Sequence, residues 1–396
     1  MTVKKIIGKI HLWLGLSSGL VVFVIAITGC LYAFQAEIQN LTQPFRFVER
    51  QGKQVLPPSE LKAVAEVELP GKHIHAVLYN GADRAAQVIF YSYDPEYYYL
   101  VYVNPYTAEV LEVKDMEADF FHFILDGHFY LWLPPEIGQP VAASATLVFV
   151  VMLISGIVLW WPRKKKDSRQ RFTVKWKARW RRVNYDLHNV LGFYASAVAL
   201  VLALTGLVWG FQWFAKGLYA AVGGEKSLVY TDPLSDTTKT YTGDIPVIDK
   251  IFYTMKQTYP DAKSIEVHIP ESNQMAIGAN ANPEEGTYWK LDYRYYDQHT
   301  LREVPVDHIY GRFPEAKASD KLLRMNYDIH TGAILGLPGK ILMFFASLIC
   351  ASLPVTGVYI WWGRRNKSRK EARKEKAKTG SVHVKKKMGQ LVKQQA

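Results

Sequence analysis

Four long apolar runs without a charged residue constrain this 396-residue chain more than any other feature. A helix crosses a hydrocarbon core of roughly 30 Å with about 20 residues, and each run reaches that length. A buried helix of a soluble protein rarely stays free of charge for so long. The sequence therefore predicts an α-helical membrane protein with four transmembrane helices, at Leu12–Phe34, Pro140–Trp161, Asn189–Ala215 and Ile341–Trp362.

The basic residues are concentrated in three short segments. The net charge is +12, and 27 of the 48 Lys and Arg residues lie in the N-terminus, the 163–182 connection and the tail after Trp362. The long connections 35–139 and 216–340 carry more acidic than basic residues. Because basic loops stay in the cytoplasm, we expect a multi-pass protein of a bacterial inner membrane with both termini cytoplasmic. Membrane lipid, not nucleic acid, is the expected partner of the basic tail, since anionic headgroups attract such segments.

Matching intervals in the two halves of the chain indicate an internal duplication. A Thr-Gly or Ser-Gly pair follows 17 residues after His11 and after His188, 27 after His128 and 26 after His330. These pairs are Thr28-Gly29, Thr205-Gly206, Ser155-Gly156 and Thr356-Gly357. Chance does not readily produce four such intervals, so we infer that span, outer segment and span occur twice.

Each long connection has the pattern of a small extracytoplasmic α+β domain. A helical stretch, at about 59–66 and 247–259, precedes alternating runs rich in β-branched and aromatic residues. We expect one helix on an antiparallel sheet in each domain. The expected strands include Ala86–Tyr93, Tyr97–Val103, Ser264–Ile269 and Thr287–Tyr293.

The duplication divides the chain into eight segments. We expect a cytoplasmic start with the first span (1–34), the first outer domain (35–120), an outer helix with the second span (121–161), a basic cytoplasmic loop (162–188), the third span (189–215), the second outer domain (216–325), an outer helix with the fourth span (326–362) and a basic cytoplasmic tail (363–396).

Four histidines stand at the ends of the predicted spans, where a coordinating side chain is a candidate for function. His11 and His188 begin the odd-numbered spans, and because 17 helical residues rise about 26 Å, both lie on the cytoplasmic side. His128 and His330 precede the even-numbered spans, on short outer helices that prolines separate from those spans. Two imidazoles can bind a haem iron from opposite faces, so we expect one haem at each pair. His122 competes with His128 for the outer haem, but only His128 keeps the repeat spacing and is favoured. No catalytic side chain is expected.

The two cysteines, Cys30 and Cys350, fall inside predicted spans and form no disulfide framework. A Cys-x-x-Cys-His sequence for covalent attachment is absent, so the expected haem is of the b type. Residues 27–30 resemble a lipoprotein processing box, but the same Thr-Gly pair recurs inside later spans, where processing is impossible. Tryptophans near the span ends fit an interfacial belt, namely Trp132, Trp160, Trp161, Trp209, Trp213, Trp361 and Trp362.

Several motifs resemble the PepSY-associated transmembrane-helix family, which includes iron-regulated inner-membrane proteins such as ferric-siderophore reductases. The matching features are Lys9-Ile-His11-Leu-Trp-Leu-Gly-Leu, Arg182-Val-Asn-Tyr-Asp-Leu-His188, Asn326-Tyr-Asp-Ile-His330, the four Thr/Ser-Gly pairs, and the stretches Tyr102–Leu111 and Tyr295–Val304. The resemblance covers nearly the whole chain apart from the basic tail. It implies four spans, two PepSY-like periplasmic domains, and bis-histidine b haems in the members that act as reductases.

These features together predict a di-haem b reductase that moves electrons from the cytoplasmic side to a periplasmic ferric siderophore or other ferric chelate. No Gly-x-Gly-x-x-Gly follows a strand, so the expected donor is separate, either a cytoplasmic reductase or the quinone pool. Two alternatives need no haem. One is a non-catalytic PepSY membrane module that binds a peptide, a peptidase or an envelope component, and the other is an accessory protein of metal uptake.

Overall fold

The computed structural model describes residues 2–162 and 171–394, with side chains described as far as Asn366. The first compact unit comprises residues 1–26, 145–200 and 346–396, and the second comprises residues 27–144 and 201–345. Part of the predicted basic loop, residues 163–170, lies outside the described residues.

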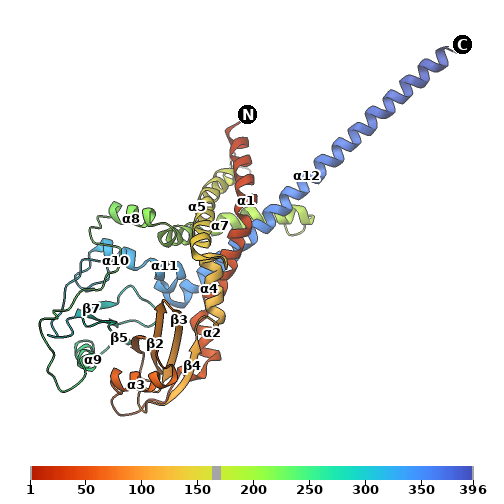
Figure 1. Cartoon of the computed structure of the whole chain (residues 1–396). Coiled ribbons are helices and arrows are strands. Elements are labelled where there is room, and N and C mark those ends of the chain that lie inside the picture. The colour runs from red at the N-terminus through yellow and green to blue at the C-terminus, as the bar shows by residue number, and fades with distance from the viewer. Residues whose placement is uncertain (1, 163–170, 395–396) are drawn as a thin grey trace. The chain divides into compact units, whose positions relative to one another are not determined.

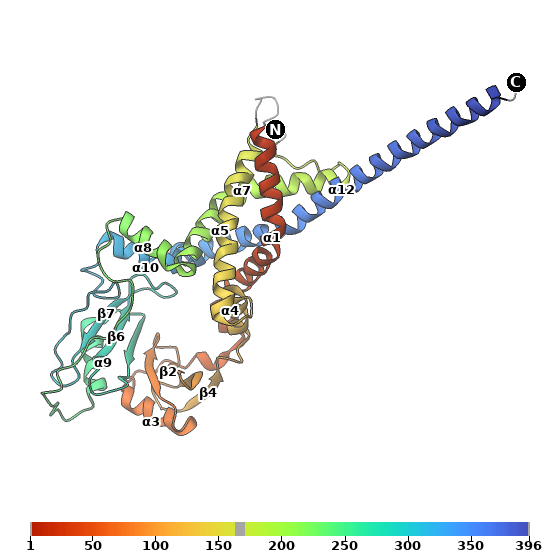
Figure 2. The same ribbon diagram turned by 45° about the horizontal axis from the view of Figure 1, so that its top comes forward.

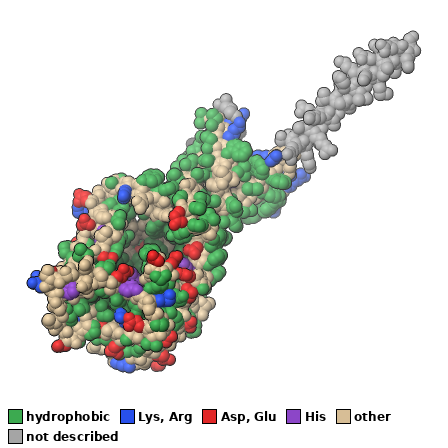
Figure 3. All heavy atoms as spheres, viewed as in Figure 1, with side chains coloured by type: hydrophobic (Ala, Val, Ile, Leu, Met, Phe, Trp, Pro, Cys, Tyr) green, Lys and Arg blue, Asp and Glu red, His purple; other side chains and the backbone are tan. Residues whose placement is uncertain are grey.

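Four helices among the described residues are long and apolar enough to span a membrane, as predicted. In the most apolar window of each, only 17–33% of the residues are buried, so most of this apolar surface requires lipid around it. Figure 3 shows the same contrast, with hydrophobic side chains over the helices and most charged side chains on the sheet-bearing part. The helices are α1 (Val3–Tyr32), α5 (Pro135–Trp160), α7 (Trp180–Gly210) and α12 (Gly336–Gln394), seen in Figures 1 and 2.

Each of these helices begins before its apolar run, and α1 and α7 begin furthest ahead of theirs. Helix α1 begins at Val3 and α7 at Trp180, although the runs begin at Leu12 and Asn189. His11 and His188 therefore lie within a helix, where the backbone conformation fixes the direction of the side chain.

A short helix before α5, α4 (Phe120–Tyr130), carries His128 as predicted. It begins because the Asp119 side chain accepts hydrogen bonds from the Phe121 and His122 amides, an N-cap arrangement. It ends at Leu131, whose φ of 58° is left-handed, and α5 starts at Pro135.

The repeat-related helix, α11 (Asn326–Thr331), carries His330 and ends at Gly332. Gly332 has a φ of +79°, and a Cβ there would lie 2.4 Å from the carbonyl oxygen of Gly339. Only glycine fits this turn, which separates α11 from α12.

The two outer segments form one antiparallel sheet of seven strands with the order β4-β3-β2-β1-β5-β6-β7. Strands β1 and β5 join the halves, with Val77 opposite Val267. The sequence predicted two separate sheets and did not indicate this join. The strands are β1 (Ile74–Tyr79), β2 (Ala86–Tyr93), β3 (Glu96–Val103), β4 (Val110–Asp115), β5 (Ser264–His268), β6 (Ile277–Asn282) and β7 (Asp292–Tyr296).

One helix from each half, α3 (Pro58–Glu68) and α9 (Val247–Thr258), packs on the sheet. The rings of Tyr79 in the first half and Phe252 in the second stack at 4.3 Å between centroids. The helices also contact each other, because the Ser59 amide and hydroxyl both donate to the Asp249 carboxylate. Further short helices among the described residues are α2 (Gln35–Thr42), η1 (Pro44–Arg46), α8 (Gln212–Ala221), α10 (Ala318–Arg324) and η3 (Ala333–Leu335).

The predicted strand Thr287–Tyr293 is wrong in most of its length, because the observed strand is Asp292–Tyr296. The Asp328 carboxylate accepts hydrogen bonds from the Tyr288 amide at 3.0 Å and the Trp289 amide at 2.8 Å. These two amides therefore donate hydrogen bonds to a side chain and not to a neighbouring strand, and the segment forms a loop.

Candidate functional site

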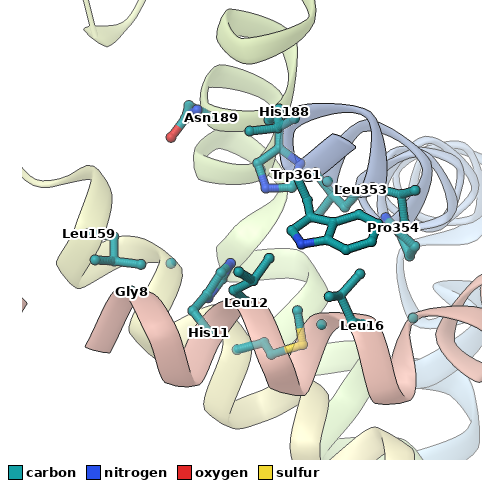
Figure 4. A pocket seen from close by; sticks show the side chains of 18 of the residues that line it. Gly8, His11, Leu12, Leu16, Leu159, His188, Asn189, Leu353, Pro354 and Trp361 are labelled. Atoms are coloured by element: carbon teal, nitrogen blue, oxygen red, sulfur yellow. The ribbon is translucent and has the colours of Figure 1, made fainter. Parts of the chain in front are cut away.

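A cavity of about 630 Å³ lies among α1, α5, α7 and α12 in the first unit. His11 from α1 and His188 from α7 both line it, and Figure 4 shows their rings directed into it beside Trp361. The remaining lining is mostly glycine and apolar side chains. A volume of this size falls in the range of about 300–1,000 Å³ typical of sites for small molecules and cofactors.

Each of these two imidazoles is oriented by a hydroxyl group. His11 Nδ1 lies 2.8 Å from Ser155 Oγ, and His188 Nδ1 lies 2.8 Å from Thr356 Oγ1. The Ser155 hydroxyl donates its proton to the carbonyl of Met152 and the Thr356 hydroxyl to that of Ser352. A hydroxyl has one proton, so its oxygen must accept from the imidazole. Both rings then carry the proton on Nδ1, which leaves the Nε2 lone pair available to a metal.

His128 and His330 meet within the second unit. Their ring centroids are 6.0 Å apart and the ring planes are inclined at 67°. Two imidazoles that bind one metal from opposite sides at about 2.0–2.1 Å have their ring centres roughly 6 Å apart, so the observed separation fits a shared metal.

The orientation of these rings repeats the arrangement at the first pair. His330 Nδ1 lies 2.8 Å from Thr205 Oγ1, and the Thr205 hydroxyl donates to the carbonyl of Val201. His128 Nδ1 lies 3.3 Å from Thr28 Oγ1. Burial, with a smaller contribution from His128, lowers the pKa of His330 to about 3. The imidazole is therefore neutral at physiological pH, as a metal ligand must be.

His122, the alternative to His128, is directed elsewhere. Its Nε2 lies 3.9 Å from the Asp126 carboxylate, and its ring lies edge-on to Tyr98 at 6.4 Å between centroids. The geometry therefore places His128, and not His122, opposite His330.

A glycine follows each of the four hydroxyl residues and leaves room for the histidine ring. A Cβ would lie 3.4 Å from His11 Cε1 at Gly156, 3.4 Å from His188 Cε1 at Gly357, 3.1 Å from His128 Cε1 at Gly29 and 3.6 Å from His330 Cε1 at Gly206. The recurring Thr/Ser-Gly pair thus has two functions, since its hydroxyl orients an imidazole and its glycine admits the ring.

Residues 9–364 match the family described as the PepSY-associated TM region. The chain belongs to this family. The resemblance expected from the sequence is thereby confirmed, as is a helical membrane protein with small β-containing domains. No curated protein matches the chain.

The residues of this PepSY-associated protein meet the requirements of a haem at the His11–His188 cavity. Within the described residues no group of three or more His, Cys, Asp or Glu side chains could hold a bare metal ion. A site with two imidazoles therefore suits a metal whose remaining donors come from a macrocycle. Apolar walls suit the porphyrin, and the only charged side chains among the described lining residues, Arg364 and Arg365, can bind its carboxylates.

The hydroxyl groups and these arginines were not among the predicted site residues of the PepSY-associated chain. The signal for the hydroxyls was present, because Thr/Ser-Gly pairs recur at a constant distance from the histidines. The tryptophan prediction is wrong for Trp160, which is 3% exposed and stacks on Phe193 at 3.8 Å. Trp161 and Trp362 are exposed, as members of an interfacial belt should be.

Proposed function

We propose that this protein is a di-haem b reductase of the bacterial inner membrane that reduces a ferric siderophore or another ferric chelate in the periplasm. The observation that carries the proposal is the reciprocal arrangement of the four histidines. Each site takes one histidine from each repeat. The hydroxyl that orients a histidine ring belongs to the other span of the same repeat.

The side chains bind and orient the cofactor. Nε2 of His11 and His188 would hold one haem iron, and Nε2 of His128 and His330 would hold the other. The hydroxyls keep Nδ1 protonated, and the apolar cavity walls exclude water from the His11–His188 site. Bound haem would supply the one-electron transfer.

The charge distribution and the resemblance support this direction of electron flow. The positive-inside rule favours the His11–His188 site on the cytoplasmic side, where a cytoplasmic reductase or a reduced quinone would deliver electrons. One electron converts Fe³⁺ in the chelate to Fe²⁺, and hard oxygen ligands then hold the iron less firmly. Ferric chelates are favoured as acceptors because ferric-siderophore reductases are among the proteins that the chain resembles.

The haem content of the detergent-purified chain, expressed with haem supplementation, tests the cofactor. We expect a Soret band and two b haems per chain. Each of His188→Ala and His330→Ala should remove about half of the haem, because each removes a ligand from one site only. His299→Ala is the control, since His299 bonds the Asn273 carbonyl in the outer domain and should leave the haem content unchanged.

Reoxidation of the dithionite-reduced protein by a ferric chelate tests the acceptor. We expect the reduced spectrum to disappear upon addition of a ferric siderophore, with one haem oxidised for each Fe³⁺ reduced. Absence of a Soret band would refute the haem proposal and leave the non-catalytic PepSY module as the better hypothesis. Haem that ferric chelates do not reoxidise would indicate a haem carrier or a different acceptor.

A further inference from the structure

The motif Asn-Tyr-Asp-x-His occurs twice, and its first and last residues bind the same threonine in each copy. Asn184 Nδ2 donates to the Thr356 carbonyl at 3.1 Å, and His188 Nδ1 bonds the Thr356 hydroxyl at 2.8 Å. The Asn and His are four residues apart, so they lie on one helix face and reach the same residue of the partner helix.

The second copy has the same geometry. Asn326 Nδ2 donates to the Thr205 carbonyl at 3.1 Å, and His330 Nδ1 bonds the Thr205 hydroxyl at 2.8 Å. The two asparagines are 3% and 7% exposed. Hydrogen bonds in such surroundings are strong, because water does not compete for either partner.

The first repeat lacks the asparagine. Isoleucines, Ile7 and Ile124, occupy the positions four residues before His11 and His128. An aliphatic side chain donates no hydrogen bond, so this contact to the partner helix does not exist there. Each site therefore combines a histidine from an Asn-containing motif with a histidine whose motif has no Asn.

We propose that Asn184 and Asn326 are positioning residues, and that the hydroxyls of Thr356 and Thr205 lower the reduction potential of the haem at each site. The inference rests on the proposed function. An Nδ1–H that donates to a hydroxyl makes Nε2 a stronger donor, which stabilises ferric over ferrous iron. Each asparagine adds a second hydrogen bond to the partner helix, beside the one made by the histidine. The rings of His188 and His330 therefore keep a fixed orientation at their sites.

Spectroelectrochemical titration of the full-length holoprotein tests the hydroxyls. Thr356→Val replaces the hydroxyl by a methyl group, and we expect one of the two midpoint potentials to rise while the other stays unchanged. Thr205→Val should raise the other midpoint alone. Thr356→Ser keeps the hydroxyl and should have the same midpoint potentials as the unmodified protein. Thr254→Val is the control, because the Thr254 hydroxyl makes the same helix-backbone bond, to Lys250, in α9.

The low-spin ferric EPR spectrum tests the asparagines. Asn184→Leu removes the amide donor at similar size, and we expect the signal of one haem to shift or broaden as the His188 ring loses its fixed plane. Asn326→Leu should affect the other signal. Should Thr356→Val fail to fold, Thr356→Ala removes the same hydroxyl with less bulk and must raise the same midpoint.

The outcomes separate this inference from the proposed function. Two haems in the unmodified protein, with midpoints that neither Thr→Val variant alters, would overturn the inference and leave the di-haem proposal intact. An equal shift in Thr254→Val would overturn it as well. An unmodified protein that binds no haem overturns both.

Discussion

Four histidine rings each lie against a glycine on a neighbouring helix, and the closest approach is at Gly29. A Cβ there would lie 3.1 Å from His128 Cε1, nearer than side-chain atoms normally pack. The hydroxyl that orients the same ring belongs to the preceding residue, Thr28. Two adjacent residues thus determine both the direction of the ring and the space that it occupies.

Gly29→Val should therefore disrupt the His128–His330 site selectively. The added side chain displaces the His128 ring, and we expect loss of roughly half of the bound haem with the His11–His188 haem retained. Gly217→Val in α8 is the matched control, because nothing lies within 4 Å of a Cβ there. The haem-to-protein ratio measures both variants. A Gly29→Val protein with full haem content would contradict the assigned contact.

The elements of the outer segments are joined across the repeat by strand pairing and by helix packing. Val77 and Val267 face each other on β1 and β5, and both are completely buried. Helices α3 and α9 cover the join, so one hydrophobic core serves both halves of the sheet. We infer that the two halves unfold together, because neither can expose its core face without exposing that of the other.

Phe252→Ala tests this shared core. Phe252 is 1% exposed and stacks on Tyr79 of the other half, so its truncation should cost about 3–5 kcal/mol of the free energy of unfolding of the sheet. Hydrogen exchange of the full-length protein should show faster exchange in both β2 and β6. The neighbouring Tyr253→Ala, at a position that is 39% exposed, should cost much less. Faster exchange confined to β6 would show that the halves are independent.

At the scale of the whole molecule, the charge distribution decides which way the protein faces. Lys and Arg accumulate at both ends of the chain and in the 163–182 connection, and the sheet-bearing segments are acidic overall. The proposed reductase needs this orientation, because its donor is cytoplasmic or in the membrane and its acceptor is outside.

Labelling with a membrane-impermeant thiol reagent checks the orientation. We expect Gly52→Cys to react in intact spheroplasts and Ser381→Cys only after permeabilisation. The unsubstituted protein supplies the background, which should be low because Cys30 and Cys350 are each 4% exposed. The opposite pattern would reverse the proposed direction of electron flow.

The sequence alone determined the properties that depend on composition and spacing. The four spans follow from uncharged apolar length, the strand β2 from its alternation, and the duplication from the intervals between histidines and Thr/Ser-Gly pairs. These signals are local or periodic, so they require no knowledge of how helices pack. The same intervals singled out His11, His188, His128 and His330 before any contact was known.

Only the tertiary structure decided which groups meet. Which hydroxyl binds which imidazole, the asparagine contacts and the β1–β5 join all depend on segments distant in sequence. The loop at Tyr288 shows the reason. Its residues have the composition of a strand, but the buried carboxylate of Asp328, forty residues later, binds its amides. Side-chain partners from elsewhere in the chain override a local preference, and no pattern within the segment reveals them.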